Sequence, residues 1–298
     1  GNGDDPTMIY SMTGYAAASR DLGSAVLNFE IKSVNSRYLD IGFRLGEDLR
    51  FLEMAMREKI TERVGRGKIE VRGYLQAQAG QAGAMRRQMP DAATLAELGR
   101  MAEEVRRALP QATPLSVAEV LRWPGVLADD SLSAEQLQAE GMGLFGGLLD
   151  EFVASRNREG AKLADVLRER AARMREQVAA VSPLVPLALA AYQERIATKL
   201  REAVANLDED RIRQEIGVFA AKIDVAEELA RLSTHLDELE RVLKKGGAVG
   251  KRLDFLMQEL NREANTLSSK SVSSEVTVIA LELKLLIEQM REQVQNLE

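Results

Sequence analysis

The clearest pattern in the chain is a row of hydrophobic residues that recur at alternating spacings of four and three. Its first members are Val225, Leu229, Leu232, Leu236, Leu239 and Leu243. This spacing is typical of an amphipathic helix that buries one stripe. The same pattern returns in Leu253, Leu256, Leu260, Ala264 and Leu267, and again in Val276, Ile279, Leu283, Leu286, Met290 and Val294. Three successive helices of this kind predict a helical bundle or a coiled-coil hairpin.

A second stripe, this one polar, runs one residue before nearly every member of the first. We call it the polar stripe; it consists of Asp224, Glu228, Arg231, His235 and Glu238. At about 100° per residue it lies beside the apolar face rather than opposite it. The following helix repeats the arrangement with Asp254, Gln258, Asn261, Asn265 and Ser268. Asn and Ser are poor helix formers, so their presence in a row indicates a role for the side chains.

The N-terminal part of the chain alternates with a period of two instead. Residues 9–20 and 25–45 are rich in β-formers, and residues 21–24 read as a hairpin turn. The alternation breaks at residues 35–37, which predicts a bulge or bend. A helix capped by Asp48 and ending at Gly65 comes next, and a strand follows over residues 68–76. These elements predict a small β-β-α-β lobe over residues 8–78.

After the lobe, helical patterns dominate. We expect a linker or mobile loop from Ala79 to Met89, and then helices over residues 91–109, 116–122 and 133 to about 180. Pro183 and Pro186 break this run before a helix that ends near Asn206, and Asp208 starts the next one. The predicted class is α+β, predominantly α. We divide the chain into a probable expression remnant (1–7, with Met8 as the native start), an N-terminal region (8–155) and a C-terminal helical region (156–298).

Composition limits the chemistry. The 298 residues contain no cysteine and one histidine, and they carry a formal net charge of −6. Disulfides, thiolate metal sites and cysteine nucleophiles are therefore excluded, and a reducing, cytoplasmic location is expected. The acidic balance argues against a general polyanion-binding surface but leaves local basic patches open. The longest apolar run contains two prolines, so no membrane span is expected.

His235 is the centre of one candidate site. With Glu228 and Glu238 on its own helix, and Glu259 and Glu263 on the next, it offers one imidazole and several carboxylates. Such a ligand set suits manganese or magnesium. Ordinary ion pairs along a helix edge explain the same residues equally well.

Two groups of basic residues are candidates for contacting phosphate. One is the glycine-containing loop with Arg241, Lys244, Lys245, Lys251 and Arg252, which lacks the Walker A pattern. The other lies on predicted strand edges and turns of the lobe and consists of Lys32, Asn35, Arg37, Arg44, Arg66 and Lys68. A solvated charged face explains the lobe residues more simply, because no aromatic RNA-recognition motif accompanies them.

Several segments together resemble the YicC/YloC family of bacterial proteins. They are MIYSMTGYAAASR, EIKSVNSRYLD, RNREGAKLADVL, DVAEELARLSTHL and, above all, GKRLDFLMQELNREANTLSSKS, and the similarity spans residues 8–296. The resemblance implies a cytoplasmic, manganese-dependent endoribonuclease that assembles as a hexamer.

Taking this resemblance together with the residues, we predict a metal-dependent endoribonuclease that prefers single-stranded RNA. A single histidine cannot supply the paired imidazoles of a metal-free ribonuclease, which favours a metal. Glu228, His235 and Glu238 would hold it, completed by Glu259 or Glu263, while Arg231 and Arg262 contact the phosphate. The basic loop, Lys270 and the basic residues of the lobe would attract RNA. The alternatives are a non-catalytic RNA-binding adaptor that recruits another nuclease and a purely structural coiled-coil protein.

Overall fold

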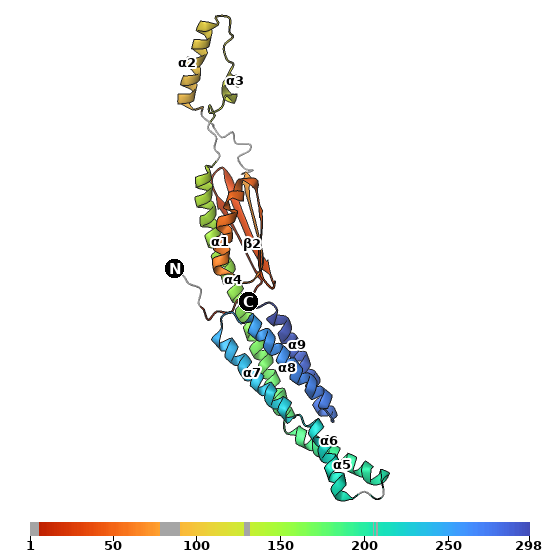
Figure 1. Ribbon diagram of the computed structural model, residues 1–298. Helices are drawn as coiled ribbons and strands as arrows, with labels where there is room; N and C mark the ends of the chain where they lie inside the picture. The colour runs from red at the N-terminus through yellow and green to blue at the C-terminus, as the bar shows by residue number, and fades with distance from the viewer. Residues whose placement is uncertain (1–5, 78–89, 128–131, 205, 207) are drawn as a thin grey trace.

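The structure is a computed structural model that describes residues 6–77, 90–127, 132–204, 206 and 208–298. The protein is elongated (Figure 1). A sheet lobe sits near the middle and is followed by a helical bundle, with a helical hairpin beyond each of them. The predicted α+β class with mostly helical content is confirmed.

The lobe contains a four-stranded sheet in the order β1-β2-β4-β3. Its strands are β1 (Gly14–Asp21), β2 (Ala25–Val34), β3 (Leu39–Leu45) and β4 (Gly67–Ala77). β2 pairs antiparallel with both β1 and β4, whereas β3 runs parallel to β4. The inner face carries Leu27, Phe29 and Ile31, which are buried as their alternation predicts.

Two details of the predicted lobe were wrong, namely the number of strands and the helix cap. The bend predicted at residues 35–37 is present at Arg37, but β2 already ends at Val34, and the chain crosses to the far edge of the sheet, where β3 begins. The lobe is therefore β-β-β-α-β. Asp48 does not cap the following helix, because the chain enters it through the 3₁₀ turn η1 (Glu47–Leu52), which has no side-chain cap and leads directly into α1 (Glu53–Arg63).

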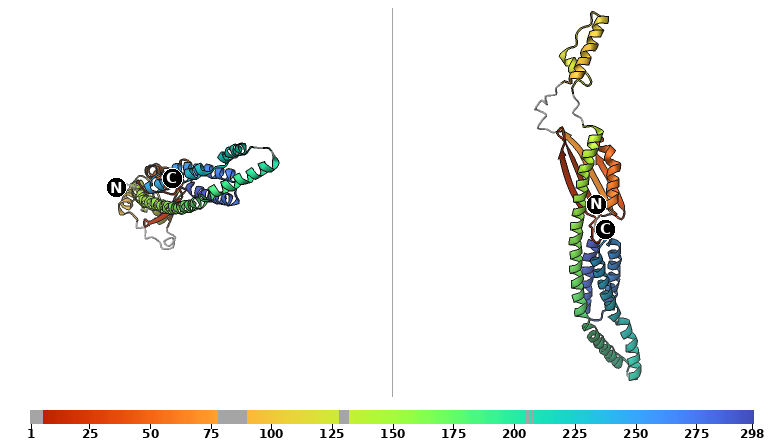
Figure 2. Two further views of the ribbon diagram at one scale, coloured as in Figure 1. Left: turned by 90° about the horizontal axis from the view of Figure 1, so that it is seen from below. Right: turned by 90° about the vertical axis from the view of Figure 1, so that its left-hand side faces the viewer.

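One helix connects the two halves of the molecule. α4 (Ala134–Val181) is 48 residues long and begins with a capping box between Ser133 and Gln136. Its first part packs against β1 and β2, and its last part packs against α7 and α9 (Figure 2). Both hydrophobic cores therefore include residues of α4, such as Phe145 in the lobe and Met174 in the bundle.

The bundle confirms the three hydrophobic stripes. It consists of the end of α4 with α7 (Ala226–Lys245), α8 (Gly250–Lys270) and α9 (Ser274–Val294), and α8 lies between α7 and α9. All members of the stripes are buried except Ile279, which packs partly buried against the same core. The four-and-three spacing thus predicted both the helices and their inward faces.

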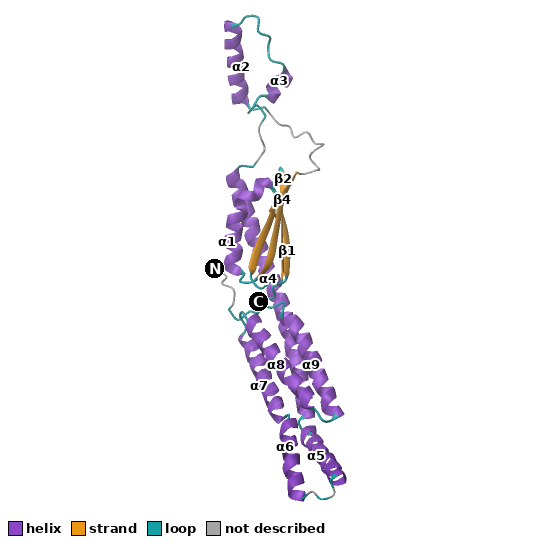
Figure 3. Ribbon diagram, turned by 45° about the vertical axis from the view of Figure 1, so that its right-hand side comes forward, coloured by secondary structure: helices purple, strands orange, loops and turns teal. Residues whose placement is uncertain are grey.

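The remaining helices form the outer hairpins. α2 (Ala92–Ala108) and α3 (Val117–Arg122) lie beyond the lobe, and α5 (Leu184–Ala203) and α6 (Glu209–Ile223) lie beyond the bundle (Figure 3). The predicted linker at residues 79–89 falls outside the described residues. In the described part of the chain, no helix combines the length and the apolar character needed to cross a bilayer.

A short network of backbone bonds joins the lobe to the bundle. The N–H of Ser11 donates to the carbonyl of Arg156 (2.9 Å), and that of Met12 donates to Asn296 (2.6 Å). Gly160 is required here, because a Cβ at this position would collide with the carbonyl of Ile9. The predicted boundary between residues 155 and 156 lies inside α4, where the helix is continuous; the division of the chain into domains remains a prediction.

Candidate nucleic-acid site at the lobe–bundle junction

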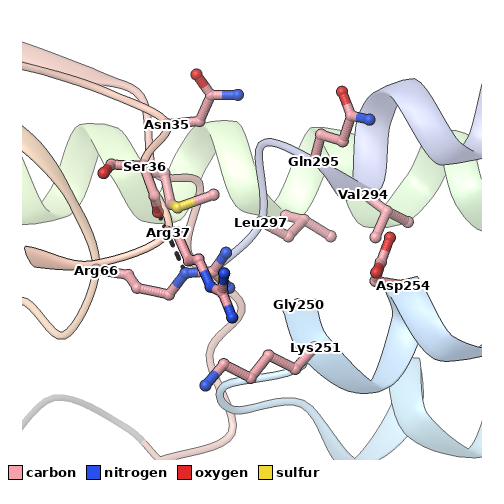
Figure 4. A pocket seen from close by; sticks show the side chains of 11 residues that line it. Asn35, Ser36, Arg37, Arg66, Gly250, Lys251, Asp254, Val294, Gln295 and Leu297 are labelled. Atoms are coloured by element: carbon pink, nitrogen blue, oxygen red, sulfur yellow. Dashed lines mark hydrogen bonds between the residues drawn. The ribbon is translucent and has the colours of Figure 1, made fainter.

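A pocket of about 320 Å³ opens where the lobe meets the bundle; we call it the junction pocket (Figure 4). Asn35, Ser36 and Arg37 enter it from the crossing between β2 and β3, and Arg66 enters from the turn before β4. The bundle contributes the beginning of α8 and the end of α9, together with Met12 of the N-terminal segment. These lining residues are Gly250, Lys251, Asp254, Val294, Gln295 and Leu297.

The junction pocket is positively charged. Arg37, Arg66 and Lys251 face it with Asp254 as the one carboxylate among its lining residues. Arg66 is held by a hydrogen bond from its Nε to the carbonyl of Ser36 (3.3 Å), and the guanidinium of Arg37 lies 5.4 Å from the ring centre of Tyr38. Guanidinium forks and an ammonium group around one hollow suit a phosphate, and the two amide side chains add further polar contacts.

The junction pocket unites four of the predicted RNA-binding residues, namely Asn35, Arg37, Arg66 and Lys251. Together they span more than two hundred positions in the sequence, from Asn35 to Lys251. Lys244 and Lys245 are exposed at the end of α7, and Lys68 is exposed on β4.

The other predicted RNA-binding residues are engaged in ion pairs. Lys32 and Arg44 lie 3.8 Å and 3.5 Å from Glu70 on the sheet. Arg252 pairs with Glu238 (3.0 Å), and Lys270 pairs with Glu228 (2.7 Å). Arg252 also lies beside the exposed ring of Phe255, with 5.5 Å between the guanidinium carbon and the ring centre.

The polar stripe of α7 does face α8, as its spacing predicts, and salt bridges cross between the helices. Glu228 and Glu263 are both buried; Lys270 neutralises the first, and Arg231 lies 3.7 Å from the second. Arg231 also pairs with Glu227. Arg262 is exposed and lies 3.5 Å from Glu259 on its own helix. His235 is half-buried within α7, and no hydrogen bond of its imidazole to another described residue is present.

The five predicted metal ligands do not fit a metal ion as they are arranged. Each carboxylate already has a cationic partner, and Glu238 has two. One oxygen, Oε2 of Glu228, is buried without a hydrogen-bond partner. Across the described residues, no three His, Asp or Glu side chains form a group that could hold a metal. We therefore derive no chemical step through a metal at the polar stripe.

The pKa of Glu238 reports how strongly its cations hold it. Hydrogen bonds from Arg241 and Arg252 lower this pKa from its usual value near 4.5 to about 2. Such a carboxyl stabilises the fold fully at pH values above the pKa that it has in the unfolded chain. This stabilisation is lost as the pH falls toward the lower pKa of the carboxyl in the folded protein.

We therefore expect Glu238→Gln to lower the melting temperature at pH 7, with a smaller difference from the wild type at pH 3. The reason is that protonation progressively removes the charge from the wild-type carboxyl between about pH 4.5 and pH 2. Thermal unfolding followed by circular dichroism at both pH values measures this. An equal difference at pH 7 and pH 3 would contradict it.

Comparison with known proteins identifies the family. Residues 9–165 match the family described as endoribonuclease YicC-like, N-terminal region, and residues 181–298 match endoribonuclease YicC-like, C-terminal. The chain belongs to the YicC-like endoribonuclease family. It is 42% identical over 293 residues to a protein of Haemophilus influenzae named probable endoribonuclease YicC, covering 98% of this chain and 100% of that protein. A protein of Clostridioides difficile with the same name is 26% identical over 302 residues, again covering 98% and 100%.

Within this YicC-like chain, Asp254 is the one charged residue lining the junction pocket that was not predicted from the sequence as a site residue. It is partly exposed and lies 3.3 Å from the amide nitrogen of Gln258. The sequence signal was its position in the second polar row, four residues before Gln258. That row pointed to a role for these side chains but not to a specific one.

Proposed function

We propose that this protein is an endoribonuclease that binds an RNA phosphate in the junction pocket and cleaves the chain there. The observation that carries the proposal is that Arg37, Arg66 and Lys251 line one pocket together with Asp254 in a member of this family. The relatives from Haemophilus influenzae and Clostridioides difficile carry the name probable endoribonuclease. An endoribonuclease that acts on cellular RNA would be located in the cytoplasm.

The pocket residues have the chemistry that phosphodiester cleavage requires. The reaction needs an activated nucleophile and neutralisation of the charge that builds up on the phosphoryl oxygens. Arg37, Arg66 and Lys251 would supply the positive charge. Asp254 would accept the proton of the attacking hydroxyl group as its oxygen bonds to phosphorus. The P–O bond to the leaving oxygen then breaks, and this oxygen takes a proton from water.

Dependence on a divalent metal, with Mn²⁺ favoured over Mg²⁺, is a separate part of the proposal. Such cations prefer oxygen ligands and are often held by one or two carboxylates together with substrate phosphates. Asp254 is the one carboxylate that lines the junction pocket, so it is the residue there that could share such a cation with a bound phosphate. A metal bound there would neutralise charge on the phosphate.

The test is cleavage of a labelled single-stranded RNA by protein purified from a nuclease-deficient host, with Mn²⁺, with Mg²⁺ and with a chelator. We expect cleavage that the chelator abolishes, and slower cleavage of the matching duplex. Binding without cleavage under every condition would favour an RNA-binding adaptor instead. Cleavage that persists in the chelator would refute only the metal dependence and not the nuclease activity.

His235→Ala distinguishes the junction pocket from the polar stripe. If the stripe is catalytic, as the sequence led us to predict, this variant loses cleavage while remaining folded. If the junction pocket is catalytic, the variant retains cleavage activity, because His235 does not line the pocket. Rates measured beside an Asp254→Asn variant therefore assign the chemistry to one place.

We also propose that the chain associates with copies of itself, with a hexamer as the expected form by family resemblance. An exposed apolar row on the outer side of α9, formed by Val278, Leu281 and Leu285, supports association. Light scattering of the purified protein gives the mass, and a monomer would contradict the proposal.

A further inference from the structure

The outer face of the sheet, opposite α1 and α4, is uncovered in the described structure (Figure 3). Its strands present two exposed tyrosines, Tyr15 on β1 and Tyr74 on β4, with 55% and 53% of their surface accessible. What sets these two tyrosines apart from other exposed aromatic residues is that both lie on the same uncovered face of the sheet. This outer face has no part in the junction pocket.

The strand register places basic and amide side chains beside these rings. Tyr15 pairs with Lys32, and Tyr74 pairs with Asn28, so each aromatic ring has a polar neighbour on the adjoining strand. Arg44 and Arg72 are paired with each other in the neighbouring row. Between these rows lies a hollow of about 690 Å³, whose lining includes Asn28, Arg44, Arg72 and Tyr74.

The charges favour an anionic partner. Glu70 lies within 4 Å of three cations: Arg72 at 2.8 Å, Arg44 at 3.5 Å and Lys32 at 3.8 Å. The hydrogen bond from Arg72 and the neighbouring cations lower the pKa of Glu70, so it remains ionised. Glu30, which pairs with Arg72 in the strand register, is the second acid of this group, so its three cations exceed its two acids by one charge. Val34 is the one large aliphatic side chain exposed on this face in the described structure, which makes an apolar protein partner the poorer fit.

The outer face is continuous with the junction pocket. β2 ends at Val34 immediately before Asn35, and β4 begins at Gly67 immediately after Arg66, and both Asn35 and Arg66 line the pocket. A single RNA strand that leaves the pocket would therefore first meet the end of the sheet where β2 ends and β4 begins. Tyr15 and Lys32 lie toward this end, and Tyr74 lies farther along.

We propose that the outer face binds a single-stranded segment of the RNA, with bases stacked on Tyr15 and Tyr74 and phosphates held by Lys32, Arg44 and Arg72. This rests on the proposed function, for which it supplies a surface that binds the single-stranded substrate. Stacking on exposed aromatic rings beside basic groups suits unpaired bases, because a duplex keeps its base faces covered. The proposal therefore explains a preference for single strands by binding rather than by the cleavage chemistry.

The test is the affinity of a fluorescently labelled single-stranded RNA, measured by anisotropy without metal. We expect Tyr74→Ala to weaken binding about tenfold and the double variant with Tyr15→Ala to weaken it further. Tyr74→Phe keeps the ring and should bind like the wild type. Tyr192→Ala is the matched control, because Tyr192 also neighbours an arginine, Arg195 at 5.8 Å, but lies on α5 beyond the bundle.

Cleavage kinetics separate this proposal from the function on which it rests. The double variant should show a raised KM with little change in kcat, because the outer face binds RNA away from the cleaved phosphate. If the double variant binds RNA with wild-type affinity and cleaves it normally, the stacking role is refuted and the proposed nuclease function stands. Tyrosine-dependent binding by a wild-type protein that does not cleave overturns the nuclease and leaves the stacking role intact.

Two further outcomes count against the proposal. If the wild type does not bind single-stranded RNA, both the stacking role and the proposed function fall. If the tyrosine variants change the mass in light scattering instead of the RNA affinity, the outer face contacts another copy of the chain.

Discussion

Lys251→Ala is expected to reduce the kcat/KM of RNA cleavage by about a hundredfold if the junction pocket holds the cleaved phosphate. Lys251 is exposed and, among the described residues, forms no ion pair, so its loss leaves no buried group without a partner. The effect should therefore fall on activity and not on stability. Initial rates over a range of RNA concentrations, together with a melting curve, measure both.

Arg66→Ala should have an effect on cleavage at least as large. Its guanidinium also bonds the carbonyl of Ser36, so this variant additionally loosens the crossing that carries Arg37. Arg66→Lys separates the two effects, since it keeps the charge but loses the fork. We expect this variant to recover part of the affinity for RNA but less of the rate.

Salt dependence offers a second readout for the same variants. Each lost phosphate contact should reduce the slope of log affinity against log salt by about one. Arg107→Ala is a suitable control because Arg107 is exposed on α2, in the hairpin beyond the lobe (Figure 1). Wild-type kcat/KM in both Lys251→Ala and Arg66→Ala would contradict the assignment of the pocket.

The helices were predictable from the sequence because their signal is local. Leu232 and Leu236 lie one turn apart whatever the rest of the chain does, and both are buried as predicted. The same holds for the alternation of Leu27, Phe29 and Ile31 on β2. Periodicity reveals which face of an element is buried without revealing what buries it.

The junction pocket could not be predicted in the same way. Its residues meet because of three features of the tertiary structure. The chain after β2 crosses to the far edge of the sheet, α4 contributes to both cores, and the C-terminal residues bond to the N-terminal segment beside the lobe. No local pattern encodes these three events. Charge alone made Arg37, Arg66 and Lys251 candidates, but their convergence in one pocket is a tertiary property.

The polar stripe illustrates the opposite case. Its spacing correctly indicated side chains facing α8, but a carboxylate and a cation at helical spacing are equally compatible with a metal site and with ion pairs. The pairs between Arg231 and Glu263 and between Lys270 and Glu228 depend on the packing of two helices, which the sequence alone does not specify.

Arg156→Ala is expected to lower the free energy of unfolding by about 3–5 kcal/mol, the usual cost of removing one partner from a buried ion pair. Arg156 is 1% exposed, lies near the rings of Tyr10 and Phe152, and pairs with Glu298. Its Nε also donates to the carbonyl of Ser11 (2.7 Å). The variant therefore removes the cation from the Glu298 carboxylate and the side-chain donor from the buried carbonyl of Ser11.

The matched control lies two residues along the same helix. Arg158 forms an exposed pair with Glu151, with 61% and 62% of their side-chain surfaces accessible, so Arg158→Ala should cost less than about 1 kcal/mol. Urea unfolding at pH 7 compares the two variants directly. A difference below about 1 kcal/mol would mean that the Arg156 pair contributes little to the fold.

A double-mutant cycle with Glu298→Gln connects stability to function. Glu298 also accepts a hydrogen bond from the N–H of Gly65, the residue before Arg66, and its own N–H donates to Tyr10. Coupling between the two substitutions measures how strongly this pair joins the lobe to the bundle. Because the lobe and the bundle each supply cations to the junction pocket, Arg156→Ala should also weaken RNA binding under conditions where the protein remains folded.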